Sequence, residues 1–431
     1  MSAALIGFLA AFILIFARVP IGMALALVGM AGFGWLVGWP QGTIMLAHAA
    51  RDASMSYGLA VIPLFVLMGN LLAGAGISAD LYRAAQSLVG HRRGGLAEAT
   101  IVSCGGFAAV SGSSVATVVT MGRVSLPSMR ELGYSDQLAT ATVAAGATLG
   151  ILIPPSVIMI IYGIMTETHI GKLYAAGLIP GALGILLYIF AIKWIVWRAP
   201  NAAPRVQKSS LSERLSALKG VWMIVALFTL VLGGIYGGLF TAAEAAGIGA
   251  FGAFILALIK GTLTVRSTYA IFLDTALTSA MMFALLFGAT VFGEFLNFTG
   301  VHHAILDLVT AQGLPPAAVI AVIVVIYLVL GCLMETLSIV LLTVPLFFPV
   351  VTGLGYDPVW FGVLLVVLIE VGLITPPIGM NLFVLRGVVP DVPLAKIMKG
   401  ILPFVAVDMA RVALIVLFPI LSLALPHLFF D

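Results

Sequence analysis

Runs of about twenty residues without a charged side chain limit most strongly how this chain can fold. Residues 314–334 (LPPAAVIAVIVVIYLVLGCLM) and residues 221–240 form two such runs. A helix of about 20 apolar residues spans a hydrocarbon core of ~30 Å, and lipid offers no partner to an unpaired backbone group. The runs lack the alternation of a β-barrel, so the sequence predicts an all-α polytopic membrane protein. With 62% hydrophobic and 9% charged residues, the composition excludes a soluble enzyme.

Two Pro-Pro pairs, at residues 154–155 and 376–377, interrupt apolar stretches at a spacing of 222 residues. The same shift aligns the Leu-Gly-Tyr of residues 132–134 with that of residues 354–356. Chance spacing of Pro and Gly would rarely give this agreement, so we infer an internal duplication. Transporters built in this way carry two inverted-topology repeats. We expect roughly 11 spans in all, plus two segments that enter the membrane and turn back.

The duplication divides the chain into two repeats and a linker. Residues 1–198 form the first repeat, residues 199–219 a basic linker with an amphipathic segment, and residues 220–431 the second repeat. The linker is rich in Arg and Lys, so the positive-inside rule places it in the cytoplasm; a nucleic-acid patch or a site for anionic lipid is the alternative. Hairpins are expected near residues 92–121 and 314–345, and broken helices near residues 136–168 and 357–389.

Each proline of these pairs removes a backbone donor from its helix. Pro154 and Pro155 leave the carbonyls of Gly150 and Ile151 without their helical N–H partners. Such carbonyls carry the negative end of the helix dipole and suit a cation, whereas the following half-helix presents donors to an anion. A proline kink that only bends a helix is the alternative. Two doublets in register favour a pair of functional breaks.

A small polar cluster precedes each Pro-Pro pair by 40 residues, residues 111–114 (SGSS) in the first half and residues 334–338 (METLS) in the second. Each cluster splits an apolar stretch into two pieces, as the tip of a helical hairpin would. Hydroxyls and exposed carbonyls are the hard oxygen ligands that Na⁺ prefers. Ser and Gly also mediate ordinary helix packing. The register with the breaks is what favours ion binding over packing alone.

Four acids lie inside apolar sequence, where a charge costs ~3 kcal/mol or more unless it is paired, protonated or near water. Glu335 belongs to the second polar cluster, so we expect it to act as a cation ligand or to support one. Glu370, just before the second break, is a weaker candidate for the same role. Glu244 and Asp408 are expected to be structural, with helix ends, Arg411 or contacts between the repeats as partners.

Motifs in order along nearly the whole chain carry a family resemblance: RVPIGMAL, IPLFVLMGNLL, RRGGLAEAT, SGSSVAT, GILIPPS, GGLFTAAEAAG and EVGLITPPIGMNLFVLRG. The chain resembles the large membrane subunit of a tripartite ATP-independent periplasmic (TRAP) transporter, the DctM-like type. The resemblance implies an elevator-type secondary transporter of the bacterial inner membrane, with Na⁺ as coupling ion and no other cofactor. It also implies a substrate that bears a carboxylate, a C4-dicarboxylate or another organic acid. A DctP-like periplasmic binding protein would deliver it, and a separate small four-helix DctQ-like subunit would complete the membrane part.

The resemblance also assigns site residues. The first Na⁺ site would comprise Ser111, Gly112, Ser113, Ser114, Gly150, Pro154, Pro155 and Ser156. The second would comprise Glu335, Thr336, Ser338, Gly372, Thr375, Pro376 and Gly379. Substrate would lie between the hairpin tips, near Ser113, Thr117, Asn381 and Arg386. Many relatives have Asp-Thr or Asp-Ser where this chain has Glu335-Thr336, so a direct ligand role for the longer Glu335 stays open.

Other classes of function are less compatible with the sequence. A related carrier that works alone, such as a dicarboxylate exchanger or an efflux protein, remains the alternative. An intramembrane enzyme would need a catalytic pair, and the chain has no HExxH, GxGD or Ser/His pattern. The histidines lack metal-ligand spacing, so no metal site is expected. Membrane lipid is expected to surround the protein, and nucleic acid is not an expected partner. Cys104 and Cys332, without a CxxC partner, are predicted to be free buried thiols.

Overall fold

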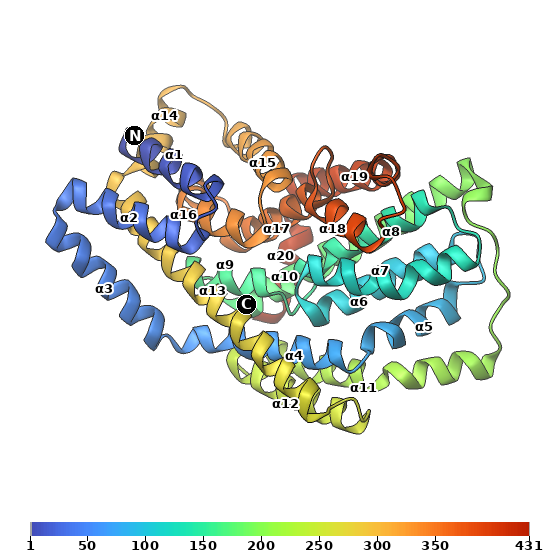
Figure 1. Cartoon of the computed structure of the whole chain (residues 1–431). Helices are drawn as coiled ribbons and strands as arrows, with labels where there is room; N and C mark the ends of the chain where they lie inside the picture. Colours follow the sequence, from blue (N-terminus) through green and yellow to red (C-terminus); the bar gives the residue numbers. More distant parts are fainter. Residues whose placement is uncertain (1, 431) are drawn as a thin grey trace.

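The computed structural model describes residues 2–430, and every regular element in that range is helical (Figure 1). The first half contains α1 (Ser2–Phe16), α2 (Ile21–Val37), α3 (Trp39–Met55), η1 (Tyr57–Ala60), α4 (Val61–Gly74), α5 (Ile77–Val89), α6 (Gly95–Ser111), α7 (Ser114–Glu131), α8 (Asp136–Thr148), η2 (Leu149–Ile151), α9 (Val157–Thr166) and α10 (Ile170–Arg198). The second contains η3 (Pro200–Ala202), α11 (Leu211–Tyr236), α12 (Ala242–Ile259), α13 (Val265–Thr299), α14 (Val301–Ala311), α15 (Pro316–Leu333), α16 (Thr336–Gly353), α17 (Pro358–Ile374), α18 (Met380–Val388), α19 (Leu394–Leu417) and α20 (Ile420–Phe430). The predicted all-α membrane architecture is confirmed.

The helices follow one another in the same order in both halves. Shifting α7 by 222 residues places its first and last residues on those of α16, and the same shift makes α6, α8, α9 and α10 overlap α15, α17, α18 and α19. The halves also interlock reciprocally, because α2 packs along α13 while its counterpart α12 packs along α4. Such exchanged contacts are those of two units related by a two-fold axis.

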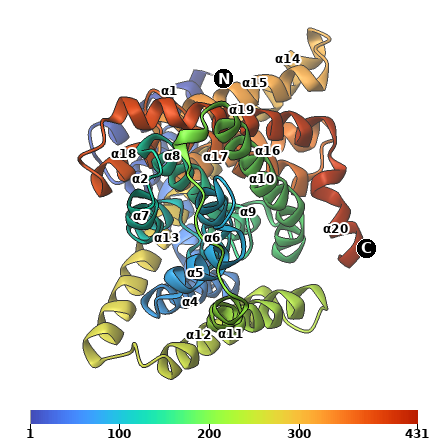
Figure 2. The same ribbon diagram turned by 90° about the vertical axis from the view of Figure 1, so that its right-hand side faces the viewer.

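Small residues allow this interlocking to be tight. A Cβ added to Gly29 of α2 would lie 2.6 Å from the carbonyl oxygen of Val291 in α13, and one added to Gly22 would meet Ala284 closer still. Close backbone contact of this kind drives the association of helices in a membrane, because lipid tails are as apolar as the side chains and give no hydrophobic driving force. Figure 2 shows α11 and α12 along one edge of the molecule, beside α4 and α5, with α19 across the opposite edge.

Seven of the described helices are long and apolar enough to cross a membrane, or eight if the bent pair α3 and η1–α4 is one span. The sequence suggested roughly 11 spans. The difference has a physical cause, since breaks divide much of the remaining apolar sequence into helices of 10–17 residues. The linker also differs in detail: α11 begins at Leu211 with a capping box of Ser210 and Glu213, so its charged first turns continue into an apolar helix.

The second arm of each hairpin and the first half of each broken helix begin at polar caps. Ser113 accepts a hydrogen bond from Ala116 N at 3.3 Å and starts α7, and Glu335 starts α16. Ser135 and Asp357 cap α8 and α17. The core centres on α17, in which every residue from 359 to 374 is buried. Glu244 also closes a capping box, with Thr241 at the start of α12, as expected of a structural acid.

Candidate functional site

The first break separates α8 and η2 from α9. Its central residues, Pro154, Pro155 and Ser156, are buried. Pro154 and Pro155 are joined by a cis peptide bond, as are Pro376 and Pro377 in the second break. Ser156 spans the break, because its hydroxyl donates to Ile151 O at 2.5 Å and accepts from Met159 N at 3.3 Å. The carbonyl of Ile151, expected to lack a donor, therefore has a side-chain partner.

The tip of the first hairpin is a compact set of hydroxyls between α6 and α7. Ser111 Oγ lies 2.8 Å from Thr117 Oγ1, which donates to Ser113 O at 2.8 Å. Gly112 turns the chain with φ of 59°, a conformation that favours glycine. Thr117, assigned above to substrate, is fully buried and braces the tip from inside.

This tip lies directly against the first break. A Cβ on Gly112 would be 3.2 Å from the Val157 side chain and 3.9 Å from Pro155 O. On the other side, a Cβ on Gly150 would be 3.0 Å from Ala108 and 3.6 Å from Thr117 Oγ1. The structure therefore brings the residues assigned to the first Na⁺ site together, with hydroxyl and carbonyl oxygens concentrated between a hairpin tip and a helix end.

The second break, between α17 and α18, is more open. The hydroxyl of Thr375 donates to the carbonyl of Val371, four residues earlier in α17, at 2.6 Å. Pro377 and Ile378 are exposed, whereas the equivalent residues of the first break are buried. Gly379, with φ of 53°, starts α18. The two breaks thus differ in access as well as in sequence.

The second hairpin contacts its break through backbone. A Cβ on Gly331 of α15 would lie 2.8 Å from Gly372 Cα of α17. The thiol of Cys332 lies 3.7 Å from Thr375 O. Thr336 and Ser338 at the start of α16 are buried, and α16 packs against α17 as α15 does. Both cysteines are free, as predicted; Cys104 is buried as expected, whereas Cys332 is only half-buried.

Glu335 acts as the N-cap of α16. Its Oε2 accepts from Leu337 N at 3.1 Å and from Ser338 N at 3.3 Å. A carboxylate in this position satisfies backbone donors that the first turn leaves free and complements the helix dipole. The carboxylate of Asp357 makes the same pair of contacts at the start of α17, with Val359 N and Trp360 N.

Asn381 of α18 reaches across to the first hairpin rather than to the second. Its amide donates to Ser114 Oγ at 2.7 Å and to Ala144 O of α8 at 3.3 Å. The side chain is completely buried, and its Oδ1 has no hydrogen-bond partner among the described residues. The half-helix after the second break thus supplies an oxygen near the first hairpin.

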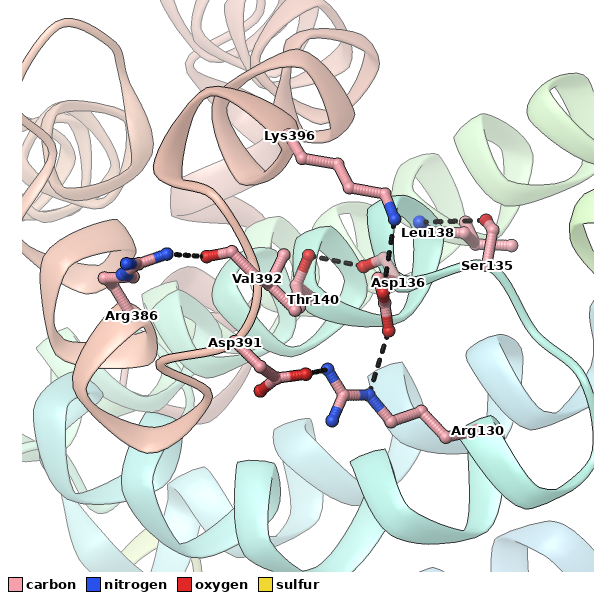
Figure 3. A network of polar contacts seen from close by, with 9 residues as sticks. All are labelled: Arg130, Ser135, Asp136, Leu138, Thr140, Arg386, Asp391, Val392 and Lys396. Atoms are coloured by element: carbon pink, nitrogen blue, oxygen red, sulfur yellow. Dashed lines mark hydrogen bonds and ion pairs between the residues drawn. The ribbon is translucent and has the colours of Figure 1, made fainter.

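Arg386, also assigned to substrate, points elsewhere in this structure. It donates to Val392 O in the loop that leads to α19 (Figure 3). It stands seven residues after Gly379, about 10 Å further along α18 at 1.5 Å per residue. Its guanidinium is therefore not brought to the hairpin tips.

An ion-pair network near that loop joins the two halves (Figure 3). Arg130 at the end of α7 binds Asp136 at 2.9 Å and Asp391 at 2.7 Å, and Lys396 of α19 binds Asp136 at 3.2 Å. Burial would raise the pKa of Asp136, but the hydrogen bonds from Lys396 and Arg130 outweigh it, and the pKa is lowered below 3.8. This network fixes α7 and α8 to α19.

A second charged cluster is completely buried. Arg411 of α19 binds Glu370 of α17 at 2.5 Å and Asp408 at 3.0 Å. Asp408 also accepts from Tyr188 of α10 at 2.5 Å. The pairing of Asp408 with Arg411 confirms the sequence expectation, whereas the joining of Glu370 to the same arginine had no sequence signal.

Two helical hairpins that close on two discontinuous helices define a membrane transporter whose site is built from helix ends. The chain belongs to the family described as the tripartite ATP-independent periplasmic transporter, DctM component, whose model matches residues 8–421. It is accordingly a transporter permease subunit rather than an enzyme.

The relatives include permeases for different substrates. The chain is 36% identical over 391 residues to the C4-dicarboxylate TRAP transporter large permease protein DctM of Pseudomonas aeruginosa, covering 90% of each. It is 34% identical over 423 residues to the sialic acid TRAP transporter large permease protein SiaM of Vibrio cholerae, covering 96% of each. The crystal structure of the Alcanivorax borkumensis YdaH transporter matches with a TM-score of 0.64 over 89% of this chain and 88% of that one. At 15% identity this match shows the fold alone.

Proposed function

We propose that this chain is the large permease of a Na⁺-coupled uptake system for an organic acid. The observation that carries the proposal is the closure of each hairpin on its own break, at Gly112 against Pro155 and at Gly331 against Gly372. Each closure gathers hydroxyl and carbonyl oxygens at the negative end of a helix, the arrangement that binds Na⁺ in broken-helix transporters.

The first cation site would be formed by the Ser111–Ser114 tip and the carbonyls around Gly150, with Asn381 Oδ1 as a further oxygen. The second would use Thr375 and the carbonyls from Gly372 onward, while Glu335 would hold the start of α16 rather than ligate the ion. The exposed Pro377 and Ile378 mark the side from which this second site is open.

The substrate would be a carboxylate bound between the hairpin tips. C4-dicarboxylates and sialic acid, the substrates named for two relatives, both carry this group. A half-helix N-terminus after a break presents N–H donors and a positive dipole end to an anion. Movement of the hairpins and broken helices against α2, α4, α12 and α13, as in an elevator, would carry the site across the membrane.

The partners would be a periplasmic binding protein and a small four-helix membrane subunit, in a bacterial inner membrane. The test is uptake into proteoliposomes that contain the permease with its small subunit, using a panel of C4-dicarboxylates and sialic acid. We expect accumulation only with an inward Na⁺ gradient and only when the binding protein is present. Uptake that needs no binding protein would instead support a carrier that works alone, and uptake without Na⁺ would overturn the proposed coupling.

A further inference from the structure

The buried cluster of Glu370, Asp408 and Arg411 lies where both breaks begin. Glu370 stands two residues before Gly372, and the residue equivalent to it by the 222-residue shift is Thr148, two residues before Gly150. Two residues correspond to about 3 Å along a helix axis. The cluster includes both equivalent positions, because Thr148 Oγ1 lies 2.8 Å from Ala145 O and 3.1 Å from Tyr188 OH.

The four helices around the cluster hold it without access to solvent. Glu370, Asp408 and Arg411 are each 0% exposed. Tyr188 connects the carboxylate of Asp408 to Thr148, so α8, α10, α17 and α19 all contribute. Gly184 of α10 leaves the space that the guanidinium occupies, because any Cβ there would collide with Arg411 Nη1.

The charges of the cluster do not balance. Two carboxylates face one guanidinium, and Arg411 is the sole buried Lys or Arg among residues 2–430. Glu370 Oε1 has no hydrogen-bond partner in that range. An uncompensated charge in a low-dielectric interior is costly unless another charge lies nearby. With both acids ionised the cluster carries one unit of net negative charge, within a few residues of two sites whose oxygens suit a cation.

We infer that Glu370, Asp408 and Arg411 form a shared counter-charge for the cations that bind at the two breaks. The acids supply the net negative charge, and Arg411 holds both carboxylates in place near the ends of α8 and α17. None of the three needs to touch the ion, so they are positioning residues. The inference rests on the proposed function, because it assigns to these residues the affinity of the proposed Na⁺ sites.

A unit charge acting over about 10 Å at an effective dielectric constant of ~20 changes binding affinity by roughly tenfold. The test measures the Na⁺ concentration for half-maximal uptake and, independently of transport, the Na⁺-dependent rise in melting temperature of the purified protein. Glu370→Gln and Asp408→Asn keep shape and remove charge. We expect each to raise the half-maximal Na⁺ concentration about tenfold, with the maximal rate at saturating Na⁺ retained.

Two controls separate charge from packing. Glu370→Asp keeps the charge and changes the fit, so it should hold Na⁺ affinity within about threefold even if the melting temperature falls. Glu98→Gln removes a buried carboxylate from the first turn of α6, away from both breaks, and should leave Na⁺ affinity unchanged. If the cluster is purely structural, the change in Na⁺ affinity should instead follow the loss in melting temperature, so that Glu370→Asp is affected whenever its melting temperature falls.

Unchanged Na⁺ affinity in both Glu370→Gln and Asp408→Asn would overturn the inference and show that the cluster is neutralised internally, by a proton. That result is distinct from failure of the proposed function, in which the unmodified protein itself would show no Na⁺ dependence of uptake or of melting temperature.

Discussion

Asn381 of the second half donates a 2.7 Å hydrogen bond to Ser114 Oγ of the first hairpin. The half-helix that follows one break is thereby tied to the hairpin that closes the other. Reciprocal packing of α7 with α18 and of α16 with α9 extends the same relationship. Each hairpin is therefore in contact with the half-helix that follows the other break.

Replacing Asn381 by Ala should weaken the first cation site. The substitution removes the donor to the buried Ser114 Oγ and a second hydrogen bond to Ala144 O, a loss of about 1–3 kcal/mol for buried groups. A double-mutant cycle with Ser114→Ala, read by Na⁺-dependent melting, should give a coupling energy above ~0.5 kcal/mol. Strictly additive effects would show that the bond does not contribute.

Gly372→Ala should abolish uptake while the protein still inserts. The new methyl group would collide with the Gly331 backbone of α15, and overpacking of this kind costs about 1–3 kcal/mol and shifts backbone. Gly387→Ala is the matched control, because a Cβ at that position of α18 meets nothing within 4 Å. Normal uptake by Gly372→Ala, measured in proteoliposomes, would mean that hairpin and break need no close contact.

Glu335 variants distinguish a helix cap from an ion ligand. Glu335→Gln retains an acceptor for Leu337 N and Ser338 N, so Na⁺ affinity should stay within about threefold. Glu335→Ala removes the cap and should cost about 1 kcal/mol of stability. Titration of uptake with Na⁺ distinguishes the two roles. If the carboxylate ligated the ion directly, Na⁺ affinity would fall about tenfold or more in Glu335→Gln.

The Asp136 network should give a small, pH-dependent stabilisation. The lowered pKa of Asp136 means that its ion pairs stabilise the fold above pH 3.8 and that this contribution disappears as pH falls through the lowered pKa. Since the side chains are 30–44% exposed except for one at 62%, the total should not exceed ~1 kcal/mol. Thermal melting of Asp136→Asn against the unmodified protein at pH 7 and pH 3 measures it, and an equal difference at both pH values would contradict the assignment.

The helices are interrupted at residues 112–113, 152–156, 334–335 and 375–379, at or beside Gly, Ser, Thr and Pro residues, which act locally on the backbone. Helix ends were harder to predict. The second arm of the first hairpin runs to Glu131, beyond the expected residue 121, since α7 accommodates Pro127 within it. Similarly, α16 contains Pro345 and Pro349 and runs to Gly353. A proline marks a possible helix end, and packing decides whether the helix continues.

Side-chain partners distant in sequence could not be predicted. Glu370 and Arg411 are 41 residues apart, and Asn381 and Ser114 are 267 apart. No local pattern relates such residues, because their meeting depends on how α17, α18 and α19 pack against the first half. Arg386 shows the same limit, since its place beside the second break indicated a role in substrate binding while the structure bonds it to the following loop.

Uptake driven by an imposed Na⁺ gradient, compared between the unmodified protein and Pro154→Ala/Pro155→Ala, tests the central claim most directly. The claim is that an interrupted helix closed by a hairpin forms the transport site. Alanines restore the missing N–H donors and should rebuild a continuous helix. We expect correctly inserted protein with no Na⁺-driven uptake. Uptake at the unmodified rate would show that the break is only a bend in the helix.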